Sequence, residues 1–194
     1  MRCFVAVELS EEIKGRLVEL QRRCAILDRS VRWTGPEQMH LTLKFLGEVS
    51  DADIASVAET MSSVAARQSP ITFLVRGVGC FPPGGAVRIF WVGVEESSGT
   101  LARLQAYCEE SFARLGFARE RRSYTPHLTI GRIKDASHSL HIRDVARREL
   151  SFEAGRQRVD ELVLFQSVLS DAGAMYVPLA RAALGPKPAG ARTL

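Results

Sequence analysis

Apolar residues recur along this chain with two different periods, which predict its strands and its helices. In residues 2–8 they alternate with other residues as in a strand, whereas over 11–27 they return every three or four positions, as on one side of a helix. Ser10 precedes that helix as an N-cap, and Glu11 and Glu12 lie in its first turn, where the helix dipole favours negative charge. The chain therefore begins with a strand and an amphipathic helix.

The same two periods divide the rest of the chain. They predict further helices over about 51–67, from Thr100 to Gly116 and over about 138–149. They predict further strands at 31–33, 40–46, 70–78, 86–94, 127–133, 159–169 and 174–179. Because strands and helices do not alternate regularly, we expect an α+β fold with largely antiparallel sheets. The tail 185–194 is rich in proline and glycine and is expected to be disordered, which leaves 1–184 as a single domain.

Two four-residue segments, 87 positions apart, nearly repeat one another. They are HLTL at 40–43 and HLTI at 127–130, and each begins a predicted strand and follows a capped helix. We interpret the chain as two related, interleaved lobes with flanking helices, each of which supplies one His-x-Thr-x strand.

Residues two apart in a strand point to the same face, so His40 shares a face with Thr42, and His127 shares one with Thr129. If the two strands lie side by side, two imidazoles and two hydroxyls line one groove. Phosphodiester hydrolysis needs a base for the attacking water and an acid for the departing oxygen, and a histidine, with a pKa of about 6.5, serves in either role. Threonine hydroxyls can donate to phosphate oxygens. The pair of motifs therefore indicates metal-independent phosphodiester hydrolysis, although a single His-x-Thr-x segment would indicate nothing.

The residues around the two motifs resemble a known family. The chain is similar to the bacterial RNA 2′,3′-cyclic phosphodiesterases, also called 2′-5′ RNA ligase-like proteins, of the two-histidine (2H) phosphoesterase superfamily. The resemblance covers about residues 1–180. It is carried by MRCFVAVEL at 1–9, Arg32-Trp33 with Pro36, HLTLKFLG at 40–47, Phe81-Pro82, Trp91-Val-Gly93, TPHLTIGR at 125–132 and VDELVLFQS at 159–167.

The resemblance implies a bilobal, pseudo-symmetric fold with an active groove between the lobes. It implies hydrolysis of RNA ends that carry a 2′,3′-cyclic phosphate, leaving a 2′-phosphate, with reversible 2′-5′ ligation as a side activity. His40 and Thr42 match the family's first motif, and His127 and Thr129 match its second. The near-symmetric motifs do not determine which histidine is the base; of the two orders, we favour His127 as base and His40 as acid.

Four further side chains are candidates for substrate binding. Strict alternation places Lys44 on the His40 face, although a strand lysine is more often simply solvated. The family often has an aromatic at the position of Phe45 and an arginine at that of Arg132, but each points to the core unless a bulge or twist intervenes. Tyr124 can stack on a base or pack in the core.

Composition narrows the setting without naming a substrate. The net charge of +4 suits a polyanionic partner but does not require one. No apolar run resembles a secretory signal or approaches the roughly 20 residues that span a bilayer. The four cysteines are scattered, as free thiols of a reducing cytoplasm are.

We therefore expect a cytoplasmic monomer that needs no metal, cofactor, membrane or obligate protein partner. Two alternatives stay open. The chain could be an esterase for small cyclic nucleotides, or a non-catalytic RNA-binding module of the same fold.

Overall fold

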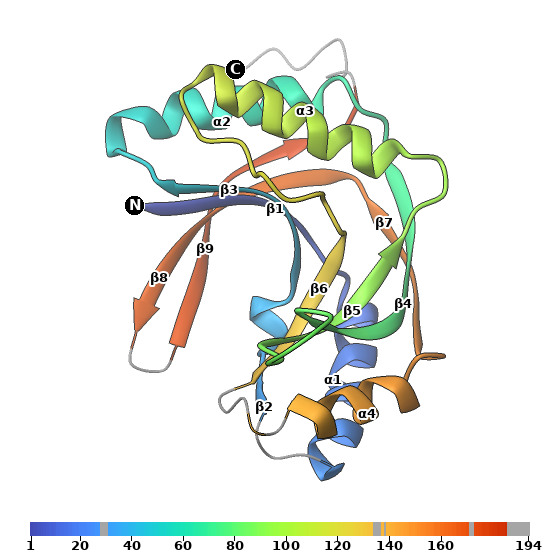
Figure 1. The fold of residues 1–194 in the computed structure, drawn as a ribbon. Helices are drawn as coiled ribbons and strands as arrows, with labels where there is room; N and C mark the ends of the chain where they lie inside the picture. The colour runs from blue at the N-terminus through green and yellow to red at the C-terminus, as the bar shows by residue number, and fades with distance from the viewer. Residues whose placement is uncertain (28–30, 134–136, 138, 171–172, 186–194) are drawn as a thin grey trace.

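The strands form two sheets in which every described pair of neighbours is antiparallel (Figure 1). The structure is a computed structural model, and it describes residues 1–27, 31–133, 137, 139–170 and 173–185. The predicted α+β fold with antiparallel sheets is confirmed. Apart from Gly185, the tail that was predicted to be disordered lies outside the described residues.

The first sheet, sheet A, contains both ends of the folded chain. Its strands lie in the order β3-β1-β8-β9. Their bounds are β1 Arg2–Glu8, β3 His40–Glu48, β8 Glu161–Ser170 and β9 Gly173–Ala183.

The second sheet, sheet B, has the order β2-β6-β5-β4-β7. Its strands are β2 Val31–Trp33, β4 Ile71–Phe81, β5 Ile89–Glu95, β6 His127–Ile133 and β7 Glu153–Val159. The sequence pattern missed β7. Its buried positions include Ala154 and Gln157 beside Val159, so it lacks the run of large apolar residues by which a strand is recognised.

Two pairs of helices cover the sheets on opposite sides of the molecule (Figure 1). The helices α2 (Ile54–Ala65) and α3 (Thr100–Arg114) pack on sheet A, and α1 (Glu11–Leu27) and α4 (Ser139–Arg148) pack on sheet B. Short 3-10 turns precede β3 and α2, at Pro36–Gln38 and Asp51–Asp53. The arrangement is crossed: α1 follows a strand of sheet A but packs on sheet B, and α3 follows a strand of sheet B but packs on sheet A.

The helix-facing sides of both sheets share one hydrophobic core. In β1, Val5 and Val7 belong to that core, whereas Phe4 and Ala6 point to the opposite face. There they form a second, small cluster with Val163, Phe165 and Tyr176. We call the face of each sheet that is turned away from the helices its open face.

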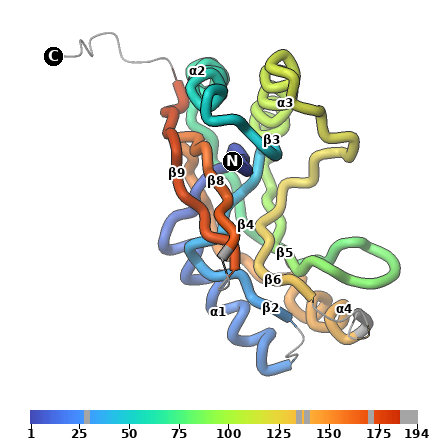
Figure 2. Tube along the Cα trace, turned by 90° about the vertical axis from the view of Figure 1, so that its left-hand side faces the viewer, coloured from blue at the N-terminus to red at the C-terminus, as the bar shows by residue number. Residues whose placement is uncertain are grey.

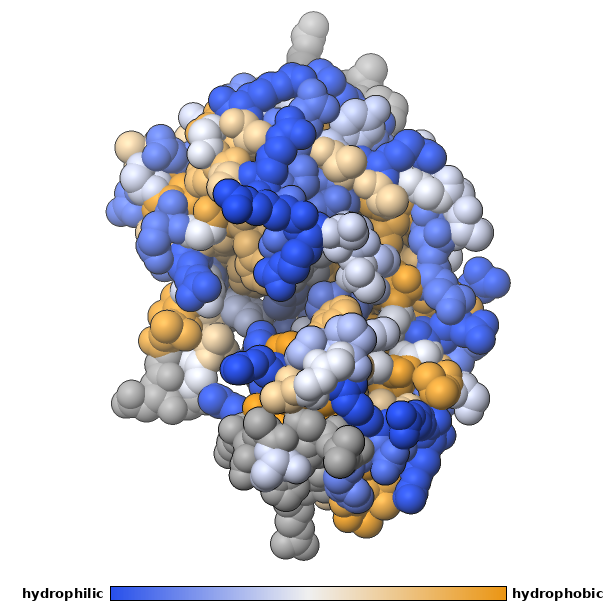
Figure 3. Space-filling view, viewed as in Figure 1, coloured by the Kyte–Doolittle hydropathy of each residue, from blue (hydrophilic) through white to orange (hydrophobic). Residues whose placement is uncertain are grey.

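The two sheets meet where β3 and β6 contact one another. In Figure 1, β8 and β9 lie to the left of β6, and β5 and β4 lie to its right; Figure 2 shows the molecule from its left-hand side. Both His-x-Thr-x segments therefore lie at the junction of the sheets. In the space-filling view, the molecule is hollowed between its upper and lower halves on the side that Figure 1 presents (Figure 3).

Two further observations concern the setting of the chain. All four cysteines lie within the described residues and are free thiols. No helix in the described ranges combines the length and the hydropathy that crossing a bilayer requires.

Candidate active site

A β-bulge interrupts β3 immediately after Thr42. Thr42 pairs with Ala6 and Lys44 pairs with Val5, so Leu43 is the extra residue. Leu43 and Lys44 are both buried on the core side, and Phe45 is 67% exposed. Beyond a bulge the two faces of a strand exchange, so Phe45 lies on the open face with His40 rather than in the core.

The same bulge occurs at the equivalent place in β6. Thr129 pairs with Trp91 and Gly131 pairs with Phe90, so Ile130 is the extra residue. Gly131 is buried and Arg132 is exposed, in the same order as in β3. Strict alternation placed Phe45 and Arg132 in the core unless a bulge or twist intervenes. A bulge is present in both strands, and both side chains are exposed.

Aromatic rings surround His40 on the open face of sheet A. The imidazole centroid lies 4.7 Å from that of Phe4, 5.1 Å from Tyr176 and 6.3 Å from Phe165. The Phe45 ring lies 6.0 Å from the Phe4 ring, which places it in the same group. His40 is therefore half-buried against an apolar wall.

His127 has a matching but smaller environment on the open face of sheet B. Its ring lies 5.0 Å from Phe81 in an edge-to-face arrangement and 6.3 Å from Trp91. Trp91 in turn covers Gly79, where an added Cβ would come within 2.2 Å of the indole. The glycine therefore lets the indole lie flat on the strand below it.

Both histidines are oriented by the same backbone hydrogen bond. Nδ1 of His40 donates to the carbonyl oxygen of Gln38 at 2.8 Å, and Nδ1 of His127 donates to that of Thr125 at 2.7 Å. A carbonyl only accepts hydrogen bonds, so each Nδ1 must carry the proton. Each Nε2 is consequently the atom that can accept or deliver a proton in a reaction.

The two histidines are also electrostatically coupled. Burial is the largest cause of a pKa of about 4 for His40, and the positive charges of Arg132 and His127 also lower this pKa, against the opposing effect of the Gln38 carbonyl. His40 of sheet A is thus within electrostatic range of two groups on β6 of sheet B. His40 is neutral at neutral pH in the ligand-free protein.

The two motif threonines accompany their histidines. Thr42 and Thr129 are each half-buried, between residues that point into the core. By the period of the strand, each hydroxyl shares the open face with the histidine two residues before it. The structure thus brings two imidazoles and two threonines to the junction of the sheets.

The prediction that Lys44 shares the face of His40 is wrong. Lys44 lies on the core side, with 2% of its side chain exposed, and its ammonium donates to Glu109 of α3 at 2.8 Å and to the carbonyl oxygen of Ala118 at 2.5 Å. The bulge at Leu43 is the reason, because it breaks the alternation on which the prediction depended. Lys44 is a buried ion-pair residue and does not face a substrate.

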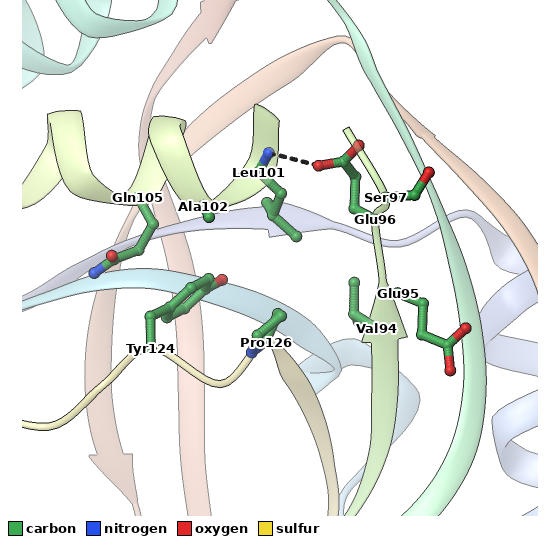
Figure 4. Close-up of a pocket in the computed structure, with 9 residues that line it drawn as sticks. All are labelled: Val94, Glu95, Glu96, Ser97, Leu101, Ala102, Gln105, Tyr124 and Pro126. Atoms are coloured by element: carbon green, nitrogen blue, oxygen red, sulfur yellow. Dashed lines mark hydrogen bonds between the residues drawn. The ribbon is translucent and has the colours of Figure 1, made fainter. Parts of the chain in front are cut away.

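Tyr124 packs against the core, which is one of the two placements considered for it. Its hydroxyl donates to the carbonyl oxygen of Thr42 at 3.2 Å, and burial raises the pKa of its phenol. Figure 4 shows Tyr124 with Pro126 in the wall of a cavity that extends to Gln105 and Leu101 of α3. Neither histidine lines this cavity, so it is separate from the candidate active site.

Several residues around the histidines were not predicted from the sequence. Phe4 and Tyr176 pack on His40, and Phe81 packs on His127, although none of them lies near a His-x-Thr-x segment in the chain. For Phe4 a signal existed, because alternation in residues 2–8 places it opposite the core-facing Val5. Within the described residues, no three His, Cys, Asp or Glu side chains gather as metal ligands do.

Comparison with known proteins gives the class of the chain. The family model described as LigT like Phosphoesterase matches it twice, over residues 7–91 and 92–176. Each match contains one His-x-Thr-x strand, in agreement with the two-lobed interpretation of the internal repeat. The chain belongs to this family of phosphoesterases.

Curated relatives narrow the comparison. The chain is 31% identical over 179 residues to a Methanothermobacter thermautotrophicus protein, with 92% of this chain and 96% of the relative covered. It is 35% identical over 179 residues to an Archaeoglobus fulgidus protein, with 92% and 98% covered. Both relatives are named RNA 2′,3′-cyclic phosphodiesterase.

Solved structures share the fold. A Thermus thermophilus protein superposes with a TM-score of 0.81 at 27% identity, covering 96% of this chain and all (100%) of that one. Escherichia coli LigT in complex with 3′-AMP superposes with a TM-score of 0.77 at 27% identity, covering 94% and 97%. The expected bilobal phosphoesterase fold is therefore confirmed.

Proposed function

We propose that this protein opens 2′,3′-cyclic phosphates at RNA ends and leaves a 2′-phosphate. The observation that carries the proposal is the matched state of His40 and His127, which come from equivalent strands, make the same Nδ1 hydrogen bond and are electrostatically coupled. The names of the curated relatives support the choice of substrate.

In this proposal the cyclic phosphate binds between the two imidazoles. A water molecule attacks phosphorus and gives its proton to Nε2 of one histidine. The bond from phosphorus to O3′ breaks, and the other histidine protonates O3′ through its own Nε2. The products are a 2′-phosphate and a free 3′-hydroxyl. If the 5′-hydroxyl of a second RNA end attacks in place of water, the same displacement forms a 2′-5′ phosphodiester, which is the ligation.

We assign His127 as the base and His40 as the acid. In the ligand-free protein the low pKa of His40 favours its neutral form. A bound phosphate brings a negative charge, which favours the protonated form that an acid needs. The hydroxyls of Thr42 and Thr129 and the guanidinium of Arg132 stabilise the charge that develops on the non-bridging oxygens.

Phe45 completes the proposed site. It is exposed on the same face as His40, where an aromatic ring can stack on the base of the terminal nucleotide. A protein that stacks a base in this way gains affinity from the nucleoside as well as from the phosphate.

The test is hydrolysis of an oligonucleotide that ends in a 2′,3′-cyclic phosphate, after treatment with a chelator. We expect full activity without added metal, a bell-shaped dependence of kcat/KM on pH, and a product that carries its phosphate on the 2′-oxygen. Loss of activity on chelation, or a 3′-phosphate product, would contradict the proposal.

The same assay separates the alternatives. An enzyme for RNA ends has a higher kcat/KM for an oligonucleotide than for a cyclic mononucleotide, whereas an esterase for small cyclic nucleotides does not. A binding module retains affinity for the oligonucleotide but releases no product.

A further inference from the structure

A sequence repeat in the helices accompanies the repeat in the strands. Residues 17–24 of α1 read LVELQRRC, and residues 101–108 of α3 read LARLQAYC. The shared pattern is Leu-x-x-Leu-Gln-x-x-Cys. Its leucines and cysteines are buried in the core at both sites, as the spacing of an amphipathic helix requires. Core packing does not explain the glutamine.

Each of these glutamines donates to the carbonyl oxygen of a bulge residue. The side-chain amide of Gln21 donates to the Ile130 oxygen at 2.9 Å, and that of Gln105 donates to the Leu43 oxygen at 3.5 Å. Ile130 and Leu43 are the extra residues of the two bulges. The two glutamines therefore match in their sequence motif and also in the atom that they bind, the carbonyl oxygen of a bulge residue.

The second proton of each amide is also used. Gln21 donates it to the carbonyl oxygen of Thr34 at 2.7 Å, next to the amide of Thr34 that itself donates to Ile130. Gln105 donates it to Glu109 at 3.2 Å. Both side chains are thus fixed by two hydrogen bonds, and Gln21 is only 7% exposed.

Such a donor stabilises a bulge. The extra residue of a bulge falls outside the regular ladder, and a buried carbonyl without a donor destabilises the conformation that exposes it. A glutamine amide from the covering helix donates to that carbonyl at both bulges, and at Ile130 it adds to the backbone amide of Thr34. It therefore favours the bulged pairing over the regular one.

The bulges decide what faces the histidines. With regular pairing, Phe45 and Arg132, each five residues after its histidine, would turn toward the core. With the bulges, both are exposed on the open faces. We propose that Gln21 and Gln105 are positioning residues, which hold the bulges that bring Arg132 and Phe45 beside the two histidines. This inference rests on the proposed function of those two side chains.

The positioning is crossed between the two halves of the chain. Gln21 belongs to the segment 7–91 but acts on a strand of 92–176, and Gln105 does the reverse. The crossed packing of α1 and α3 makes this necessary. Each half of the site consequently depends on a helix of the other half.

One experiment measures the bulge without any substrate. Gln21→Met keeps the length of the side chain and removes both donors. We expect hydrogen exchange at the amide of Thr34, which donates to Ile130, to accelerate by about tenfold. Cys24→Ala is the matched control, one turn further along the same motif, and we expect it to leave this exchange rate unchanged.

A second experiment uses double variants to test whether each glutamine acts through the residue that it positions. We expect Gln21→Met to lower kcat/KM on an oligonucleotide with a 2′,3′-cyclic phosphate by about tenfold, mainly through KM, and by less than about twofold when Arg132→Ala is already present. Gln105→Met should behave in the same way with Phe45→Ala. The control for α3 is Cys108→Ala, with unchanged kinetics.

The outcomes separate the two proposals. Equal losses with and without Arg132→Ala, or unchanged exchange at Thr34, would overturn the positioning role of Gln21. Absence of hydrolysis by the unsubstituted protein would instead overturn the proposed function, and the exchange measurement would still test the bulge. Gln105 is less buried than Gln21, so Gln105→Met tests the same inference even if Gln21→Met does not fold.

Discussion

The rings of Phe4 and His40 lie 4.7 Å apart on the open face of sheet A, tilted by 30°. This contact belongs to the apolar surroundings that lower the pKa of His40 to about 4. An apolar neighbour cannot replace the water that stabilises an imidazolium ion, so burial favours the neutral ring.

The stability of the protein should therefore depend on pH through His40. Between its folded pKa of about 4 and its ordinary value of 6.5, the unfolded chain binds a proton that the folded protein does not. The free energy of unfolding should fall as the pH drops from 6.5 to 4, by at most about 3 kcal/mol from this residue. Denaturant unfolding at pH 7, 5.5 and 4 would show a smaller decrease for His40→Gln. Parallel curves for the two proteins would contradict the assigned cause.

Replacement of either histidine should stop hydrolysis without unfolding the protein. We expect His40→Ala and His127→Ala each to lower kcat/KM by about a thousandfold or more, because each removes one of the two proton transfers. Circular dichroism and thermal unfolding would establish that the variants are folded. Nearly full activity in either variant would exclude a mechanism that needs both.

The acid and the base can be distinguished by the leaving group. A substrate with sulfur in place of the 3′-oxygen departs as a thiolate and needs no protonation. His40→Ala should therefore lose at least about tenfold less activity on the sulfur substrate than on the oxygen substrate, whereas His127→Ala should lose the same on both. The opposite pattern would reverse the assignment.

The hydroxyls of the motif threonines should contribute to the transition state. We expect Thr42→Val and Thr129→Val each to lower kcat by about a hundredfold, the usual effect of removing one donor to a developing negative charge. Thr72→Val is the control, because this exposed threonine lies in β4 of the same protein, away from both motifs. Equal kcat values for all three variants would show that the motif hydroxyls have no catalytic role.

The buried pair of Lys44 and Glu109 should matter for stability. Lys44→Met leaves the partly buried carboxylate of Glu109 without its cation and should cost about 3 kcal/mol of the free energy of unfolding. The double variant Lys44→Met with Glu109→Gln removes both charges and should recover part of that loss. Urea unfolding of the single and double variants measures the interaction free energy between the two side chains. Strictly additive effects would show that Lys44 and Glu109 do not stabilise one another.

The sequence by itself was enough to recognise the family of this protein. Two near-identical segments with His40 and His127 predicted a pair of equivalent strands, and local periodicity predicted most of the helices and strands. Both signals are local, since they depend on residue types and their spacing within a few turns or strand residues. The strand β7 was missed because its core-facing positions hold Ala154 and Gln157 beside Val159.

Only the tertiary structure decided which side chains accompany the histidines. Alternation alone pointed Lys44 toward His40 and Phe45 into the core, and the bulge at Leu43 reverses both. A bulge is a property of two paired strands and of the groups that satisfy its extra carbonyl, here a glutamine from a helix 62 residues away in the chain. The local periodicity of the strand does not reveal such a long-range contact.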